Sequence, residues 1–135
     1  MAMVTLSIII PAYNEERRIS RTLSKIISYV KSRSVDTEII VVDDGSADDT
    51  IKAARKISER KGLPVKILRD EENKGKGYSV RRGMLSSSGK YPLFTDADSS
   101  TPIQELKKLL PRLESGEYDI AIGSRSLAGS KVKIP

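Results

Sequence analysis

Apolar and polar positions along the chain follow two periodicities, one typical of buried strands and the other of amphipathic helices. Short apolar runs, several of them rich in β-branched side chains, have the length and composition of strands buried on both faces. The first run should end at Pro11, because proline donates no hydrogen bond to a ladder. Five runs predict strands: residues 5–11, 37–42, 64–68, 91–95 and 118–124.

Between these runs, apolar residues recur three and four positions apart, which predicts amphipathic helices. The second helix should end at Gly62, and residues 46–49 supply candidate caps for its start. A third helix is expected over residues 77–88, entered through a glycine-rich loop. The other apolar faces consist of Ile19, Leu23, Ile26, Ile27 and Val30; Ile51, Ala54 and Ile57; and, from about Pro102, Ile103, Leu106, Leu109 and Leu113.

This alternation of strand and helix predicts an α/β fold with a mostly parallel sheet flanked by helices. We find no internal repeat or linker, so residues 1–135 are expected to form a single domain. The chain stops a few residues after the fifth predicted strand, before any helix that would cover it. Apolar surface exposed there would favour self-association, and we therefore expect a homo-oligomer.

Composition narrows the possible chemistry. Hydrophobic residues make up 38% and charged residues 31% of the chain, as in soluble globular proteins. No apolar run approaches the roughly 20 residues of a membrane span, and a signal-peptide pattern is missing, so a cytoplasmic location is the default expectation. The chain has no Cys and no His. Thiolate zinc sites and Ser-His-Asp catalysis are thereby excluded, and a bound metal would need oxygen ligands, which favours magnesium or manganese.

The net charge of +6 is unevenly distributed, with 12 Lys/Arg against 4 Asp/Glu between Lys52 and Lys90. Such a bias is compatible with nucleotide phosphates, nucleic acid or an anionic membrane surface, or simply with a well-solvated surface. With five Tyr and one Phe, the chain has few side chains on which single-stranded nucleic acid could stack.

Each predicted strand is followed by a polar stretch with chemically useful side chains. In parallel α/β sheets, ligands bind beyond the carboxyl ends of the strands, so these stretches should converge on one site. They read, in chain order, "PAYNEE", "DDGSADDT", "RDEENKGKG", "DADSS" and "GSR".

Asp96 and Asp98 are separated by one residue after the fourth strand. At this spacing both carboxylates could approach one ion together with phosphate oxygens, since magnesium usually takes one or two protein carboxylates. The same stretch also suits a plain strand-to-helix turn in which a residue of 99–101 caps the next helix.

Asp43 and Asp44 follow the second strand, and Asp44-Gly45 suits a tight turn. Two adjacent acids exceed what a turn requires, and one could accept a hydrogen bond from a nucleobase or a ribose hydroxyl. We interpret Asp48 and Asp49 as helix-cap residues.

The segment "NKGKGYSVRRG" combines glycines, whose amides can approach an anion, with four cations. Its spacings differ from those of the P-loop and of the dinucleotide fingerprint, and a solvated basic helix is the alternative. The four cations are Lys74, Lys76, Arg81 and Arg82.

Taken together, "SIIIPAYNEE", "EIIVVDDGSADDT", "NKGKGYSVRRGM", "LFTDAD" and "IAIGSR" resemble, in order and spacing, family 2 glycosyltransferases of the Rossmann-like GT-A fold. The resemblance extends to about residue 130 and is nearest to dolichyl-phosphate (polyprenyl-phosphate) glucosyl- and mannosyltransferases. It implies metal-dependent, inverting transfer from a nucleotide diphosphate sugar to a lipid phosphate, with UDP-glucose favoured over GDP-mannose as donor. The acceptor-binding segments of such enzymes are expected to be absent from this chain.

The resemblance also implies roles for individual residues around the donor. Asp43 matches the acid that reads the base or the ribose, with Asp44 beside it. Lys76 and Arg82 match basic positions near the diphosphate. The remaining nucleoside contacts would come from Pro11, Ala12, Tyr13 and Glu15.

For the metal, Mg²⁺ or Mn²⁺, the resemblance implies Asp96 and Asp98, with Asp98 favoured as the direct ligand. Gln104 would join them, although the "SSTPIQ" spacing departs from the "DLQHP" form of mannosyl members. Arg125 would contact the leaving-group or acceptor phosphate. No general base is assigned, since an acceptor phosphate is already largely ionised near pH 7.

Several expectations about partners follow from this resemblance. The acceptor would be a lipid phosphate, with peripheral association at the cytoplasmic face of a membrane and no nucleic-acid partner. Two alternatives stay open at this point. One is a nucleotide-sugar-binding module or inactive fragment without turnover, and the other is a basic nucleic-acid-binding protein.

Overall fold

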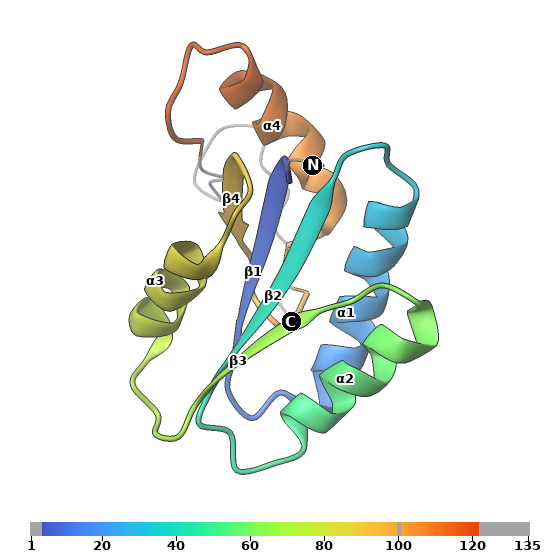
Figure 1. Ribbon diagram of the computed structural model, residues 1–135, viewed down its shortest axis with the longest axis vertical. Helices are drawn as coiled ribbons and strands as arrows, with labels where there is room; N and C mark the ends of the chain where they lie inside the picture. The colour runs from blue at the N-terminus through green and yellow to red at the C-terminus, as the bar shows by residue number, and fades with distance from the viewer. Residues whose placement is uncertain (1–3, 100, 122–135) are drawn as a thin grey trace. The chain divides into compact units, whose positions relative to one another are not determined.

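The computed structural model describes residues 4–99 and 101–121, and its elements follow the predicted order (Figure 1). The chain divides into two compact units, Met1–Ile103 and Gln104–Pro135. The first unit holds β1 (Leu6–Ala12), α1 (Glu16–Lys31), β2 (Thr37–Asp44), α2 (Thr50–Lys61), β3 (Lys66–Asp70), α3 (Lys76–Ser86) and β4 (Tyr91–Phe94). A 3-10 turn at Ile103–Glu105 leads into α4 (Leu106–Glu114), the helix of the second unit.

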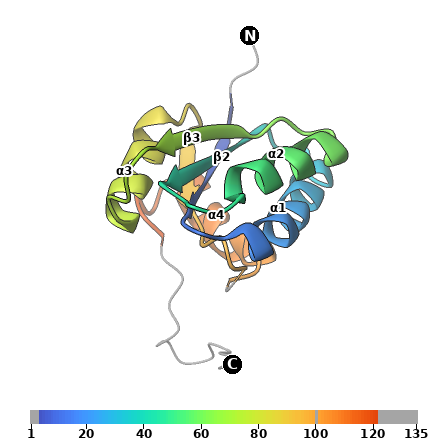
Figure 2. The ribbon, with the colours of Figure 1, turned by 90° about the horizontal axis from the view of Figure 1, so that it is seen from below.

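The four strands form one parallel sheet in the order β3-β2-β1-β4. Helices α1 and α2 lie on one side of this sheet, and α3 lies on the other (Figures 1 and 2). The α/β class and the parallel sheet predicted from the sequence are therefore confirmed. Because all the strands run the same way, their carboxyl ends lie along one edge of the sheet.

Both faces of the central strands are buried. On the α3 side, Ile9, Ile40 and Val42 form a core cluster against which Met84 of α3 packs. Side chains alternate between faces along a strand, so Ile8 and Val41 belong to the opposite, α1–α2 side. This two-sided burial explains why β1 and β2 read as continuous apolar runs.

The predicted helices α1 and α2 are confirmed, although on α2 only Ala54 and Ile57 of the predicted apolar face are buried and Ile51 is partly exposed. All five predicted apolar residues of α1 are buried, and Thr22 is buried with them. Helix α2 ends at Gly62, whose φ of 69° is left-handed, the conformation that glycine adopts most readily at a helix end.

Pro11 does not end β1, which continues to Ala12. Pro11 pairs in register with Val42 of β2, whereas pairing of β1 with β4 stops at Ile9 and Phe94. The Ile9 carbonyl accepts the Thr95 amide at 3.0 Å and therefore points toward β4. The backbone nitrogen of Pro11, two residues further along β1, points to the same side. Its missing N–H therefore falls just beyond β4 and costs no ladder bond.

The predicted fifth strand is not formed over residues 118–121, the part of it that the structure describes. Tyr118 and Ile120 are exposed there, at 50% and 75%. A strand needs a hydrogen-bonded neighbour, and the described residues of the second unit provide none. Residues 122–124 lie outside the described part of the chain.

Gly83 brings α3 into direct contact with the sheet. A Cβ at this position would overlap Ile9 and lie 3.1 Å from the Val42 Cγ2 atom. Gly77, near the start of the same helix, has open space around it instead.

We expect Gly83→Ala to destabilise the fold by about 1–3 kcal/mol, because the added methyl group overpacks a fully buried contact. Gly77→Ala is the matched control and should be neutral or stabilising by less than about 1 kcal/mol. Urea unfolding followed by circular dichroism measures both. Equal free energies of unfolding for the two variants would contradict the close packing of α3.

Candidate functional site

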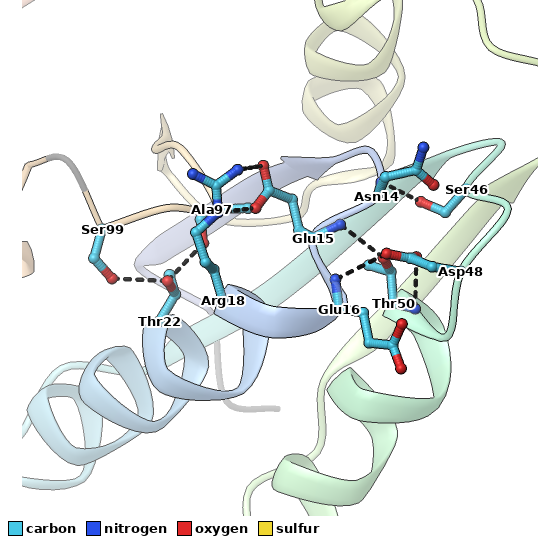
Figure 3. Close-up of polar contacts among 10 residues, drawn as sticks. All are labelled: Asn14, Glu15, Glu16, Arg18, Thr22, Ser46, Asp48, Thr50, Ala97 and Ser99. Atoms are coloured by element: carbon cyan, nitrogen blue, oxygen red, sulfur yellow. Dashed lines mark hydrogen bonds and ion pairs between the residues drawn. The ribbon is translucent and has the colours of Figure 1, made fainter.

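The loops that follow the four strands are joined to one another by hydrogen bonds at the carboxyl edge of the sheet. The first two loops are joined through Asn14 (Figure 3). Its amide donates to the Ser46 hydroxyl at 2.8 Å, and its side-chain oxygen accepts the Ala47 amide at 2.9 Å. Asn14 has a φ of 51°, a left-handed conformation that asparagine tolerates better than most residues.

Asp48 serves the first turns of two helices. One carboxylate oxygen accepts the Thr50 amide at 3.1 Å and the Thr50 hydroxyl, while the other accepts the Glu16 amide at 3.2 Å (Figure 3). Burial alone would raise the pKa of Asp48, but these hydrogen bonds outweigh it and hold the pKa below its ordinary value. The capping role predicted for Asp48 is thus confirmed, and it extends to α1.

Asp43 and Asp44 are both buried, and as neighbours in β2 they belong to opposite faces of the sheet. Asp43 accepts the Ser46 hydroxyl at 2.5 Å and the Ser46 amide at 3.2 Å. It also lines a groove that runs along α2, together with Arg69, its register partner in β3. The other residues that line this groove are Ser46, Ala47, Asp48, Asp49, Ile51, Lys52, Arg55, Lys56 and Glu59.

Asp44 holds the glycine-rich loop from the α3 side. Its two carboxylate oxygens accept the amides of Lys74 and Gly75, at 2.7 and 2.8 Å. Gly45, with a φ of 73°, lets this loop approach closely, because a Cβ there would lie 2.8 Å from the Asn73 nitrogen. The second of the two adjacent acids is therefore explained by the loop it holds.

Asp70 ends β3 beside Asp44 and pairs with Arg82 of α3 at 2.5 Å. Asp70 is buried, with 7% of its side chain exposed, whereas the Arg82 side chain is 36% exposed. The second oxygen of Asp70 has no hydrogen-bond partner in the structure. The buried carboxylate of Asp70 thus holds Arg82, one of the cations expected near the diphosphate.

The Asp96–Asp98 segment follows β4 and surrounds the buried Ala97. Asp98 is exposed and Asp96 is partly exposed. The ammonium group of Lys76, the first residue of α3, forms an ion pair with Asp96. A cation of the glycine-rich loop and a carboxylate of the D-x-D pair therefore meet at one point.

Asp96 and Asp98 have the oxygen-ligand chemistry that a hard divalent cation prefers. Within the part of the chain that the structure describes, no group of three or more acidic side chains could hold a metal by itself. Two accessible carboxylates are nevertheless what Mg²⁺ commonly takes from a protein when substrate phosphates and water complete its coordination. Asp96 and Asp98 would supply the oxygens, and phosphate would supply the rest.

The other predicted site residues are placed as follows. Pro11 and Ala12 are buried at the end of β1, and Tyr13 beyond them is 48% exposed. Glu15 makes a two-point ion pair with Arg18, at 2.6 and 2.8 Å. Gln104 is exposed in the second unit, and Arg125 lies outside the described residues. Their proposed contacts with ligand or metal stay predictions.

Some residues of this edge were not predicted from the sequence. Asn14 could have been suspected from its place in the polar stretch after β1. Arg69 and Asp70 begin the polar stretch "RDEENKGKG" and could have been suspected in the same way; the structure places both at the end of β3. Thr22, within an amphipathic helix, carried no signal that set it apart from the core.

A parallel sheet with acidic and basic loops at its carboxyl edge is the arrangement of nucleotide-binding α/β proteins. The model of "glycosyl transferase family 2" matches residues 7–133, and the chain belongs to this family.

The chain is also similar in sequence to named glycosyltransferases from other organisms. The chain is 42% identical over 134 residues to a dolichyl-phosphate beta-glucosyltransferase of Drosophila melanogaster, covering 90% of this chain and 40% of the relative. It is 38% identical over 128 residues to a dolichol-phosphate mannosyltransferase of Pyrococcus furiosus, and this alignment covers 95% of this chain and 35% of the relative. The chain thus spans about two fifths of the length of these relatives.

Solved structures agree on the fold, and the expected GT-A class is confirmed. A mannosyltransferase from Pyrobaculum calidifontis, in complex with GDP-Man and Mn²⁺, aligns with a TM-score of 0.65 at 26% identity, covering 78% of this chain and 30% of that one. Glucosyl-3-phosphoglycerate synthase from Mycobacterium tuberculosis, in complex with Mn²⁺, UDP-glucose and phosphoglyceric acid, also aligns with a TM-score of 0.65. The identity is 29%, and the alignment covers 84% of this chain and 40% of that one.

Asp48 should make stability depend on pH. Because its folded pKa is lowered, its contribution is complete above the unfolded pKa of about 4 and is lost as the pH falls through the folded value. We therefore expect Asp48→Asn to be less stable than the wild type at pH 7, by a margin that shrinks below about pH 4. Urea unfolding at pH 7, 5 and 3.5 measures this margin. Asp49→Asn, at an exposed position without a capping bond, is the control, and a pH-independent margin for Asp48→Asn would contradict the assignment.

Asp44→Asn should release the glycine-rich loop, because an amide has one acceptor oxygen where the carboxylate uses two. One backbone N–H would face an NH₂ group, at a cost of about 1–3 kcal/mol. Hydrogen exchange at Lys74 and Gly75 should accelerate more than it does elsewhere in the first unit. Glu72→Gln makes the same charge change at an exposed position of this loop, and equal exchange in both variants would show that Asp44 does not hold the loop.

Proposed function

We propose that the chain is the donor-binding part of a metal-dependent glycosyltransferase that transfers glucose from UDP-glucose to dolichyl or another polyprenyl phosphate. Family membership and the names of the relatives support this class of reaction. The observation that carries the proposal is the ion pair between Lys76 and Asp96. At that point a diphosphate could contact a cationic loop and a metal-binding carboxylate pair simultaneously.

The donor would lie along the carboxyl edge of the sheet. The groove between α2 and β3 offers a carboxylate, Asp43, and a guanidinium, Arg69, to the edge of a nucleobase. Tyr13, half exposed beyond β1, offers a ring for stacking. The glycine-rich loop then brings Lys76 to the diphosphate, next to Asp96.

When bound by Asp96 and Asp98, a divalent cation would neutralise charge that develops on the diphosphate leaving group. The chain's own cations would act in the same direction. Lys76 is positioned by its pairing with Asp96, and Arg82 by the buried Asp70. Donors that are already oriented stabilise developing charge without reorganisation.

The acceptor chemistry accounts for the absence of an assigned base. An oxygen of the acceptor phosphate would attack the anomeric carbon of glucose from the face opposite the diphosphate, and the carbon–oxygen bond to UDP would break with inversion. A phosphate is largely ionised near pH 7, so the attacking oxygen carries no proton that must be removed. We also propose that the reaction takes place at a membrane surface, because the acceptor would be lipid-linked, and on the cytoplasmic side of that membrane. Among the residues that the structure describes, none of the helices is long and apolar enough to span a membrane.

Calorimetric titration of the 135-residue chain with UDP, GDP and an RNA oligonucleotide, in MnCl₂ or in EDTA, tests the donor site. We expect UDP to bind more tightly than GDP and to gain affinity from Mn²⁺. RNA binding that is tight, steeply salt-dependent and indifferent to Mn²⁺ would contradict the proposal. Incubation with UDP-glucose and dolichyl phosphate then tests transfer, and UDP binding without a glucosylated lipid would reduce the chain to a binding module.

In the same titration, Asp98→Ala should abolish the gain in UDP affinity that Mn²⁺ provides, while weak binding in EDTA and the far-ultraviolet circular dichroism spectrum stay unchanged. The reason is the loss of one of two metal-binding carboxylates. Asp36→Ala removes an exposed carboxylate at the opposite end of β2 and should behave as the wild type. Unchanged UDP affinity of Asp98→Ala in MnCl₂ would count against the metal site.

A further inference from the structure

Thr22 is a buried polar residue on the otherwise apolar inner face of α1. The buried residues of this helix are Ile19, Thr22, Leu23, Ile26, Ile27 and Val30, and Thr22 is 3% exposed. A hydroxyl placed among aliphatic side chains costs free energy unless it is hydrogen-bonded. Threonines within helices commonly donate to the carbonyl four residues back in their own helix. Thr22 uses its proton elsewhere.

The hydroxyl of Thr22 contacts the loop after β4, 75 residues along the chain (Figure 3). It donates to the Ala97 carbonyl at 2.6 Å, and its oxygen lies 2.7 Å from the Ser99 hydroxyl. A threonine hydroxyl has one proton, so Ser99 is the donor in the second bond. The Thr22 hydroxyl thus both donates and accepts a hydrogen bond with residues of this loop.

These two bonds fix the peptide that separates the carboxylates of the D-x-D pair. Ala97 lies between Asp96 and Asp98 and is buried, whereas Asp98 is exposed and Asp96 partly so. Ser99 has a φ of 58°, an uncommon conformation for serine, and its hydroxyl bond to Thr22 holds the chain just beyond Asp98. The loop is therefore anchored through its middle and at its end.

We propose that Thr22, together with Ser99, is a positioning residue for the metal-binding carboxylates Asp96 and Asp98. The inference rests on the proposed function, because it concerns the metal site of that reaction. Divalent cations require their ligands at defined distances, and Mg²⁺ in particular demands near-octahedral geometry. Residues that orient metal ligands typically change metal affinity by about 10–100-fold when they are replaced.

The test is a manganese titration in the presence of saturating UDP, with free Mn²⁺ measured by its electron paramagnetic resonance signal. Thr22→Val keeps the shape of the side chain and removes the hydroxyl, and we expect it to weaken Mn²⁺ binding about tenfold. Thr22→Ser keeps the hydroxyl and should restore affinity to within about twofold of the wild type. UDP affinity in EDTA should be the same in all three proteins.

A control separates positioning from general loss of stability. Ile27→Val trims a fully buried side chain of the same helix, and it should lower the midpoint of urea unfolding without changing Mn²⁺ affinity. Mn²⁺ affinity of Thr22→Val within about twofold of the wild type would overturn the inference, as would an equal loss in Ile27→Val.

The remaining outcomes are also decisive. If Thr22→Val does not fold, Ser99→Ala is measured in its place. This variant removes the Thr22–Ser99 hydrogen bond by a change outside the core. Mn²⁺ affinity of Ser99→Ala equal to that of the wild type would then overturn the inference. If the wild-type chain itself binds no Mn²⁺ in the presence of UDP, the metal site of the proposed function fails and the inference fails with it. Mn²⁺ binding by the wild type with no response to either hydroxyl variant refutes the inference alone.

Discussion

The structure depends on one constraint, which is that successive side chains of a parallel strand alternate between the faces of the sheet. At the carboxyl end of β2 this alternation sends Asp43 and Asp44 to opposite sides. Asp43 bonds to Ser46 and lines the groove beside α2, whereas Asp44 bonds to the amides of Lys74 and Gly75. A shift of one residue in the β1–β2 register would exchange these roles and move Ile40 and Val42 from the α3 side to the α1–α2 side of the sheet.

The same edge shows how loops are held in place where regular structure ends. Amides in the first turns of helices lack partners within the helix, and carboxylates or hydroxyls of neighbouring loops supply them. Asp48 serves α1 and α2 simultaneously, and Thr50 accepts the Glu15 amide. Because each loop is bonded to the next, the positions of Asp43, Lys76 and Asp96 depend on contacts between segments that are distant in sequence.

The sequence predicted the elements well because their signals are local. The spacing of isoleucines in α1, the glycine that ends α2 and the β-branched run of β2 each lie within one segment. The strand-end rule also placed the acidic and basic stretches at one edge. Other features required three-dimensional information. Nothing within α1 distinguishes Thr22 from a residue that only packs, since its partner Ala97 is 75 residues away. The continuation of β1 through Pro11 depends on where β4 stops pairing, which no local pattern encodes.

The two cations expected near the diphosphate each have an acidic partner within the chain. Lys76 pairs with Asp96, and Arg82 pairs with the buried Asp70. An exposed pair such as Lys76–Asp96 contributes little to stability, because solvent screens it and two flexible side chains must be ordered. In the proposed function the value of this pair would lie in orientation, since a cation already held near the diphosphate would need less rearrangement when the donor binds. The Arg82–Asp70 pair differs, because its acid is buried and would be left uncompensated if Arg82 turned fully to a ligand. In the proposed function, Arg82 would therefore share its guanidinium between Asp70 and a phosphate, whereas Lys76 would exchange its partner completely.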